Sequence, residues 1–142
     1  MRWLATGGYS GYAPVAPGTC GSLVGLGLFL LLASLPALLY GVMLAGVIGL
    51  GIWTAGEAER LFGRKDAAVI VIDELAGMLV TYYGIPVSFW PLAIGFGCFR
   101  LFDIYKPWPQ LERLPGGWGV MLDDLWAGIL ANGCIRVFLW SV

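Results

Sequence analysis

Residues 23–56, LVGLGLFLLLASLPALLYGVMLAGVIGLGIWTAG, contain no charged side chain. A single helix of this length would extend about 50 Å, well beyond the roughly 30 Å hydrocarbon core of a bilayer. Pro36 and the nearby Gly41 mark a turn inside the stretch, because proline interrupts helical hydrogen bonding. The stretch therefore predicts a helical hairpin with arms near 23–35 and 41–57, both short for membrane spans.

The composition of the whole chain is that of a membrane protein. Of its 142 residues, 59% are hydrophobic and 12% are charged, against roughly 45–50% and about 25% in soluble globular proteins. Seven tryptophans and six tyrosines fit the aromatic belts of membrane interfaces. The formal net charge of −1 argues against a nucleic-acid partner, since no basic stripe is present. We expect one membrane-embedded domain over residues 1–142.

The rest of the chain predicts further helices and a distinct N-terminal segment. We expect three more helices, over residues 67–84, 88–106 and 119–140. KPWP must stop the second of these, because proline lacks the N–H and disfavours helix just before it. Residues 1–22 are rich in glycine and proline and predict a re-entrant or interfacial segment, with Thr19 or Ser22 as a helix N-cap. The predicted fold class is an all-α, polytopic bundle of about five membrane helices.

Charged residues gather on one side of this topology. Successive spans alternate in direction, so one side of the membrane holds the N-terminal segment, the 57–66 loop and the 107–118 loop. The basic residues on that side are Arg2, Arg60, Arg64, Lys65, Lys106 and Arg113. The positive-inside rule makes it cytoplasmic, and all nine carboxylates map to the same half. Arg136 lies near the far end of the last helix, where it could snorkel outward.

Two adjacent acidic pairs, Asp73-Glu74 and Asp123-Asp124, each run directly into a long apolar stretch. An ionised carboxylate in a low-dielectric setting is costly unless a cation neutralises it. Mg²⁺ prefers oxygen ligands and is usually held by one or two carboxylates plus substrate phosphate. We therefore expect these four acids to bind Mg²⁺ at the cytoplasmic interface. The alternative is that each acid forms a structural salt bridge.

Two further segments could bind phosphate. Arg100, Asp103 and Lys106 lie along one side of a helix end, where the arginine offers bidentate contacts and the lysine a mobile charge. Asp103 could orient them, add a metal ligand or accept a proton. A salt-bridge ladder within the helix is the alternative. Thr19 and Ser22, in the segment PGTCGS, could contact an anion at a helix N-terminus or simply cap the helix.

The sequence also excludes several phosphatase chemistries. The chain has no histidine, so a histidine base and a phosphohistidine intermediate are absent. Its three cysteines are scattered, none lies six positions before an arginine, and no D-x-D motif occurs. The nucleophile is then either a water activated by a metal ion, which we favour, or the hydroxyl of Thr19 or Ser22.

Four segments together resemble the phosphatidylglycerophosphatase A family of bacterial membrane phosphatases. They are PGTCGSL (17–23), D-x6-DELAGM (66–78), FRLFDIYKPWP (99–109) and GGWGVMLDDLWAG (116–128). Gln110 stands where the family is expected to have an aliphatic residue. Lys65 stands where histidine is often found. Neither departure touches the central acids.

The resemblance implies a multi-pass enzyme of the bacterial inner membrane with its active site on the cytoplasmic face. It implies Mg²⁺-dependent hydrolysis of phosphatidylglycerophosphate to phosphatidylglycerol and inorganic phosphate in phospholipid biosynthesis, with the substrate lipid held in the bilayer. A phosphatase of another phosphomonoester lipid and a non-enzymatic cation-conducting protein are the alternatives. A phospholipid-forming phosphotransferase is disfavoured, because the D-G-x-x-A-R pattern is missing. The number of ions, the identity of the base and the oligomeric state stay open.

Overall fold

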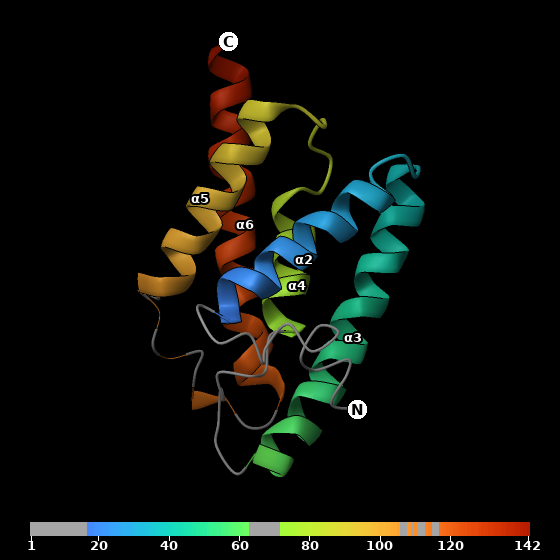
Figure 1. The fold of residues 1–142 in the computed structure, drawn as a ribbon, viewed down its shortest axis with the longest axis vertical. Helices are drawn as coiled ribbons and strands as arrows, with labels where there is room; N and C mark the ends of the chain where they lie inside the picture. The colour runs from blue at the N-terminus through green and yellow to red at the C-terminus, as the bar shows by residue number, and fades with distance from the viewer. Residues whose placement is uncertain (1–16, 63–71, 106–107, 109, 111–112, 115–116) are drawn as a thin grey trace.

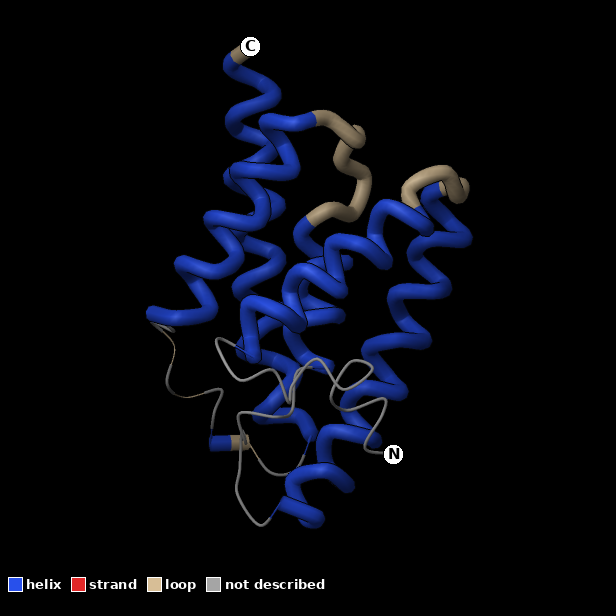
Figure 2. Tube along the Cα trace, in the orientation of Figure 1, coloured by secondary structure: helices blue, strands red, loops and turns tan. Residues whose placement is uncertain are grey.

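The computed structural model describes residues 17–62, 72–105, 108, 110, 113–114 and 117–142. This part of the chain is all-helical, with five helices and no strand, as the sequence predicts. The helices are α2 (Pro17–Leu32), α3 (Ala37–Phe62), α4 (Ile72–Thr81), α5 (Phe89–Tyr105) and α6 (Gly117–Ser141) (Figure 1). The two described connections, residues 33–36 and 82–88, lie at the same end of the molecule and carry no charge (Figure 2).

Several predicted helix boundaries are wrong. Helix α2 begins at Pro17 rather than near residue 23, because proline is favoured in the first turn of a helix. Thr19 and Ser22 are therefore inside α2 and are not N-caps. Helix α3 has 26 residues, about 39 Å, so the second arm of the hairpin is not short. Helix α6 starts at Gly117, inside the segment predicted to be a loop.

Helix α4 is the buried centre of the bundle. It contacts α2, α3, α5 and α6, and nine of its ten residues are buried. Met78 and Leu79 pack in one cluster with Phe29 of α2 and Phe99 of α5. The helix that carries the first acidic pair is therefore enclosed by four others.

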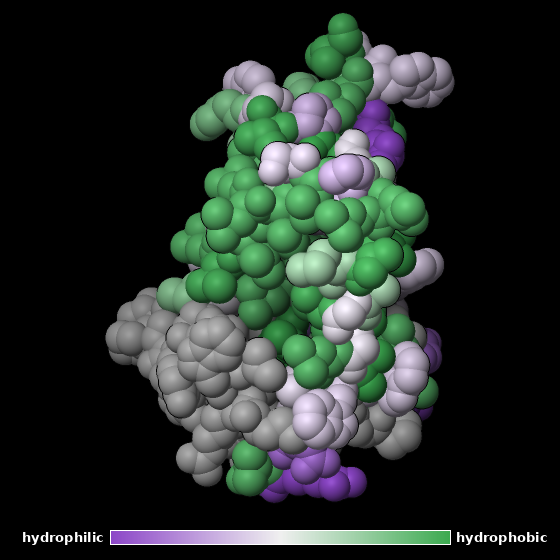
Figure 3. All heavy atoms as spheres, turned by 90° about the vertical axis from the view of Figure 1, so that its right-hand side faces the viewer, coloured by the Kyte–Doolittle hydropathy of each residue, from purple (hydrophilic) through white to green (hydrophobic). Residues whose placement is uncertain are grey.

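The outer helices present apolar side chains to their surroundings. Helix α3 contains a stretch, Ala37–Thr54, that is long and apolar enough to cross a membrane, and only 17% of it is buried. Leu38 and Val42 are 82% and 60% exposed. Figure 3 shows a broad hydrophobic surface over the middle of the molecule on the side of α3, with hydrophilic atoms near its lower and upper ends. Among the described helices, α3 alone is long and apolar enough to be a candidate membrane span. The sequence predicted about five such helices.

Candidate active site

Helices α4 and α6 approach each other closely at two glycines. A Cβ atom added to Gly128 would lie 2.5 Å from the carbonyl oxygen of Gly77, and one added to Gly77 would lie 2.8 Å from the carbonyl oxygen of Asp124. Gly77 follows Asp73 by four residues, and Gly128 follows Asp124 by four. Residues four apart share a helix face, so the glycine contact brings the two acids together.

Three carboxylates converge next to this contact. Asp73, Glu74 and Asp124 each offer an oxygen within 4.8 Å of the other two, and all three are buried. The backbone N–H of Glu74 donates to Asp73 Oδ1 at 3.0 Å, whereas Glu74 Oε2 has no hydrogen-bond partner among the described residues. Buried carboxylates this close are costly unless positive charge lies beside them. A donor set made only of carboxylate oxygens suits a hard cation such as Mg²⁺.

Asp123 does not belong to this group, although it is also buried. Adjacent helical residues point about 100° apart, so Asp124 and Asp123 cannot both face α4 in the same way. On α4 both acids take part, since glutamate has the longer side chain. The structure thus brings together three of the four acids that the sequence predicts as a set.

Helix α5 places an ion pair near the acidic group. Arg100 Nη1 donates to Asp103 Oδ2, and the two side chains are 18% and 10% exposed. Asp103 and Asp124 both lie near enough to Glu74 for their charges to act on it. The pair is the salt bridge that the sequence left as an alternative for Arg100. Phosphate binding by Arg100 stays a prediction, and Lys106 lies outside the described residues.

Helix α2 runs beside α4 in the same direction. Gly25 packs against Leu75 and Met78, and further along the ring of Phe29 stacks on that of Tyr82 with centroids 4.8 Å apart. The first turns of α2, α4 and α6 consequently point toward the same part of the molecule (Figure 1). Ser22 is buried and Thr19 is half-buried at this end of α2.

Comparison with known proteins identifies the family of this chain. The sequence model for Phosphatidylglycerophosphatase A matches residues 3–139. The chain belongs to the phosphatidylglycerophosphatase A family. It is 36% identical to Phosphatidylglycerophosphatase A of Escherichia coli K12 over 93% of this chain and 79% of that protein. It is 37% identical to Phosphatidylglycerophosphatase A of Haemophilus influenzae over 92% and 83% respectively.

A third relative carries a different name. A Bacteroides thetaiotaomicron protein with the provisional name phosphatidylinositol-3-phosphatase is 35% identical over 98% of this chain and 93% of its own length. No solved structure matches the fold. Three of the segments that carry the resemblance to phosphatidylglycerophosphatase A contribute acids to the site described above. The segments are 66–78, 99–109 and 116–128, and the acids are Asp73, Glu74, Asp103 and Asp124.

In this phosphatidylglycerophosphatase A family member, the sequence did not predict the contacts that Asn132 and Arg136 make at the end of α4. Asn132 Nδ2 donates to the carbonyl oxygens of Thr81 and Tyr83 at 2.9 Å and 3.0 Å. Arg136 Nη2 also donates to the Tyr83 carbonyl, at 3.0 Å. The guanidinium of Arg136 therefore binds the end of α4, a role that the snorkelling expectation did not include. The available signal was a polar residue inside an otherwise apolar helix.

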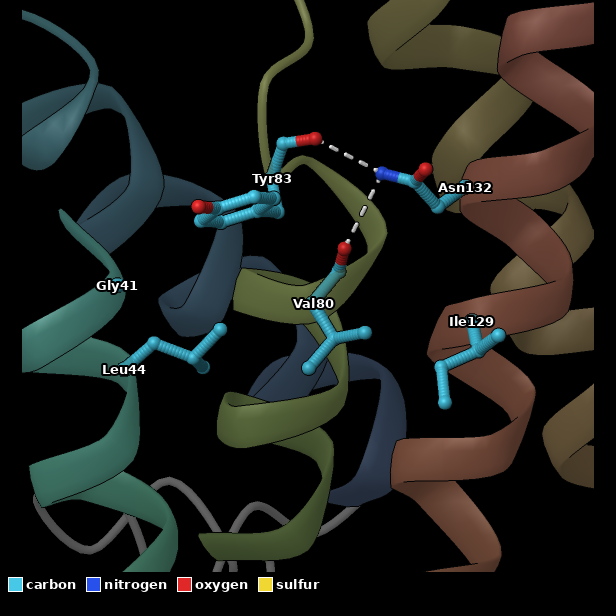
Figure 4. Close-up of a pocket in the computed structure, with 6 residues that line it drawn as sticks. All are labelled: Gly41, Leu44, Val80, Tyr83, Ile129 and Asn132. Atoms are coloured by element: carbon cyan, nitrogen blue, oxygen red, sulfur yellow. Dashed lines mark hydrogen bonds between the residues drawn. The ribbon is translucent and has the colours of Figure 1, made fainter. Parts of the chain in front are cut away.

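A separate groove lies away from the acids. It has a volume of about 410 Å³ and is lined mainly by apolar side chains between α3, α4 and α6. The lining residues are Gly41, Leu44, Val80, Tyr83, Ile129 and Asn132 (Figure 4). None of the described residues that line it is a carboxylate or carries a positive charge, so the carboxylate group is the stronger candidate for the chemistry.

Proposed function

We propose that this chain hydrolyses phosphatidylglycerophosphate to phosphatidylglycerol and inorganic phosphate, with Mg²⁺ as its cofactor. The observation that carries the proposal is the convergence of Asp73, Glu74 and Asp124 from α4 and α6. The names of two relatives support the substrate, because both are phosphatidylglycerophosphatase A proteins. The all-oxygen, buried donor set supports the cofactor.

In this mechanism the three converging carboxylates hold Mg²⁺. When bound, the ion supplies positive charge that stabilises the phosphoryl group during the reaction. Arg100, released from Asp103, and the N–H groups in the first turn of α2 bind the remaining phosphate oxygens. Arginine suits this role because its guanidinium can contact two phosphate oxygens at once.

The hydrolytic step needs a base and a proton donor. A water molecule attacks phosphorus and loses a proton to a buried carboxylate, for which Asp103 and Asp123 are the candidates. The bond between phosphorus and the glycerol oxygen breaks, and that oxygen leaves with the electron pair and takes up the proton that the carboxylate accepted. The products are the lipid alcohol and inorganic phosphate.

We further propose a multi-pass arrangement in the bacterial inner membrane, with the acids at the cytoplasmic side. The exposed apolar residues of α3 and the uncharged connections at the opposite end support it. The lengths of α2, α5 and α6, about 24, 26 and 38 Å, allow further tilted or partial spans. The lipid tails remain in the bilayer while the headgroup enters the site.

Cysteine labelling tests the arrangement. With the native cysteines replaced by serine, Val42→Cys should resist a membrane-impermeant maleimide from both sides. Arg60→Cys should react only in vesicles that expose the cytoplasmic face. Rapid labelling of Val42→Cys in intact membranes would refute the assignment of α3 as a span.

Phosphate release from defined lipids tests the activity. The purified protein should release phosphate from phosphatidylglycerophosphate in Mg²⁺, lose this activity in EDTA, and regain it when Mg²⁺ is restored. Phosphatidate and phosphatidylinositol 3-phosphate complete the panel, because the name of the Bacteroides relative favours a phosphoinositide as the second candidate. Cation flux across vesicles without phosphate release would favour the cation-conducting alternative.

A further inference from the structure

One side of α6 makes four successive contacts with α4 and the residues just after it. The residues, each four apart, are Asp124, Gly128, Asn132 and Arg136, which we call the α6 stripe. Asp124 meets the acids of α4, and Gly128 meets Gly77. Asn132 and Arg136 meet the last turn of α4 and the residues just after it. The stripe therefore joins the acidic group at one end of α4 to a polar contact at the other.

The polar contact satisfies carbonyl groups that the end of a helix leaves open. Asn132 Nδ2 donates to the carbonyls of Val80, Thr81 and Tyr83 at 3.3, 2.9 and 3.0 Å (Figure 4 shows two of these bonds). Arg136 Nε donates to Asn132 Oδ1 at 2.7 Å and so orients the amide. Nη2 of the same arginine reaches the Tyr83 carbonyl. In apolar surroundings these carbonyls are costly to leave unpaired, so the contact resists separation of α4 from α6.

The geometry of α4 transmits this contact to the acids. Helix α4 has ten residues, about 15 Å, and is held to α6 at its middle by the Gly77–Gly128 approach. Two fixed points on so short a helix determine where its first turn lies. The positions of Asp73 and Glu74 relative to Asp124 consequently depend on the hydrogen bonds at the far end.

We propose that Asn132, oriented by Arg136, is a positioning residue that sets the affinity of the acidic group for its divalent cation. The inference deepens the proposed function and rests on it for the identity of the cation site. Asn132 itself touches neither the acids nor the substrate phosphate in this arrangement.

The test compares Asn132→Leu with Gly133→Ala in the full-length protein. Leucine keeps the approximate size of asparagine and removes the donors. Gly133 is the next residue of α6, and a Cβ atom there has nothing within 4 Å, so alanine is a matched control. Mn²⁺ binding by electron paramagnetic resonance and the Mg²⁺ dependence of phosphate release give the cation affinity. Lipid KM and hydrogen exchange of residues 72–81 are measured on the same samples.

Asn132→Leu should weaken Mn²⁺ and Mg²⁺ affinity about tenfold, in the range found when groups that orient metal ligands are removed. Its lipid KM should stay within about twofold of wild type, and saturating Mg²⁺ should restore most of kcat. Arg136→Gln leaves Asn132 in place and should give a smaller change in the same direction, which keeps the test valid if the leucine variant folds poorly. Gly133→Ala should match wild type.

Two results separate failure of this inference from failure of the proposed function. If the wild-type protein binds the cation and Asn132→Leu and Arg136→Gln bind it with the same affinity, the positioning role is overturned and the cation site stands. A wild-type protein that binds no Mn²⁺ would overturn the cation site. In that case, equal hydrogen exchange at residues 72–81 in Asn132→Leu and wild type would overturn the positioning role as well.

Discussion

Substituting Gly128 by alanine tests the reasoning that connects helix packing to catalysis. The added Cβ would lie 2.5 Å from the Gly77 carbonyl oxygen, whereas ordinary contacts begin at 3.4 Å. The obstacle is backbone, which cannot rotate away as a side chain can. The helices must therefore move apart by about 0.9 Å, the difference between these two distances. Overpacking of this kind costs about 1–3 kcal/mol of stability.

The same displacement should also lower activity. A displacement of about 1 Å at a catalytic site can cost on the order of 100-fold in rate. Gly128→Ala should thus lower phosphate release at limiting Mg²⁺ by about that factor, with partial recovery at high Mg²⁺ if the carboxylates can still be drawn together. Phosphate release and thermal unfolding in detergent micelles would be measured together.

Gly46→Ala is the control for Gly128→Ala, because a Cβ atom at Gly46 has nothing within 4 Å. It should keep full activity, and its unfolding temperature should not fall, since alanine favours helix over glycine. A folded Gly128→Ala protein with wild-type activity at limiting Mg²⁺ would refute the link between the glycine contact and the acidic group.

Four other variants examine individual roles. Asp124→Asn should reduce phosphate release by more than about 100-fold, beyond the loss typical of groups outside the metal shell. The activity of Asp123→Asn should depend less on Mg²⁺ concentration than the activity of Asp124→Asn. Equal Mg²⁺ dependence of the two variants would return Asp123 to the metal group. The double variant Thr19→Ala/Ser22→Ala should lose no more than about tenfold if water is the nucleophile, whereas loss of a nucleophilic hydroxyl costs on the order of 10⁶-fold. Arg100→Gln should raise the lipid KM by about tenfold or more, because a hydrogen bond to a charged group contributes about 1.5–3 kcal/mol; an unchanged KM would leave Arg100 as a structural partner of Asp103.

The sequence predicts the helical class and the acids for a simple physical reason. Charge is so unfavourable in an apolar chain that Asp73, Glu74 and Asp124 stand out without any structure. Helix ends are harder to predict, since Pro17 and Gly117 favour turns and helix starts alike. Which acid of a pair faces inward depends on helix rotation, and this rotation is fixed by tertiary contacts.

Those tertiary contacts involve residues whose importance is invisible in composition. Gly77 and Gly128 are two glycines among 22, and only the approach of two backbones distinguishes them. Asn132 is a single amide whose partners are carbonyls about 50 positions away in the chain. A pattern of non-aliphatic residues every fourth position, from Asp124 to Arg136, was present in the sequence, but its meaning requires knowing that α4 lies against it.

Magnitudes support the proposed cation, rather than helix dipoles, as the partner of the acidic group when its carboxylates are ionised. The carboxylate oxygens lie within 4.8 Å of one another, and two unit charges at that limit repel by about 3.5 kcal/mol at an effective dielectric constant of about 20. Three ionised carboxylates contain three such pairs, so their mutual repulsion is about 10 kcal/mol before desolvation is counted. The N-terminal dipole of α4 offsets about 0.3–1 kcal/mol, and Asp124 lies beyond the first turn of α6, where such a dipole has little effect. Helix geometry alone therefore cannot keep Asp73, Glu74 and Asp124 ionised together, and a divalent ion among their oxygens can. The same ion would attract the phosphomonoester of a lipid headgroup.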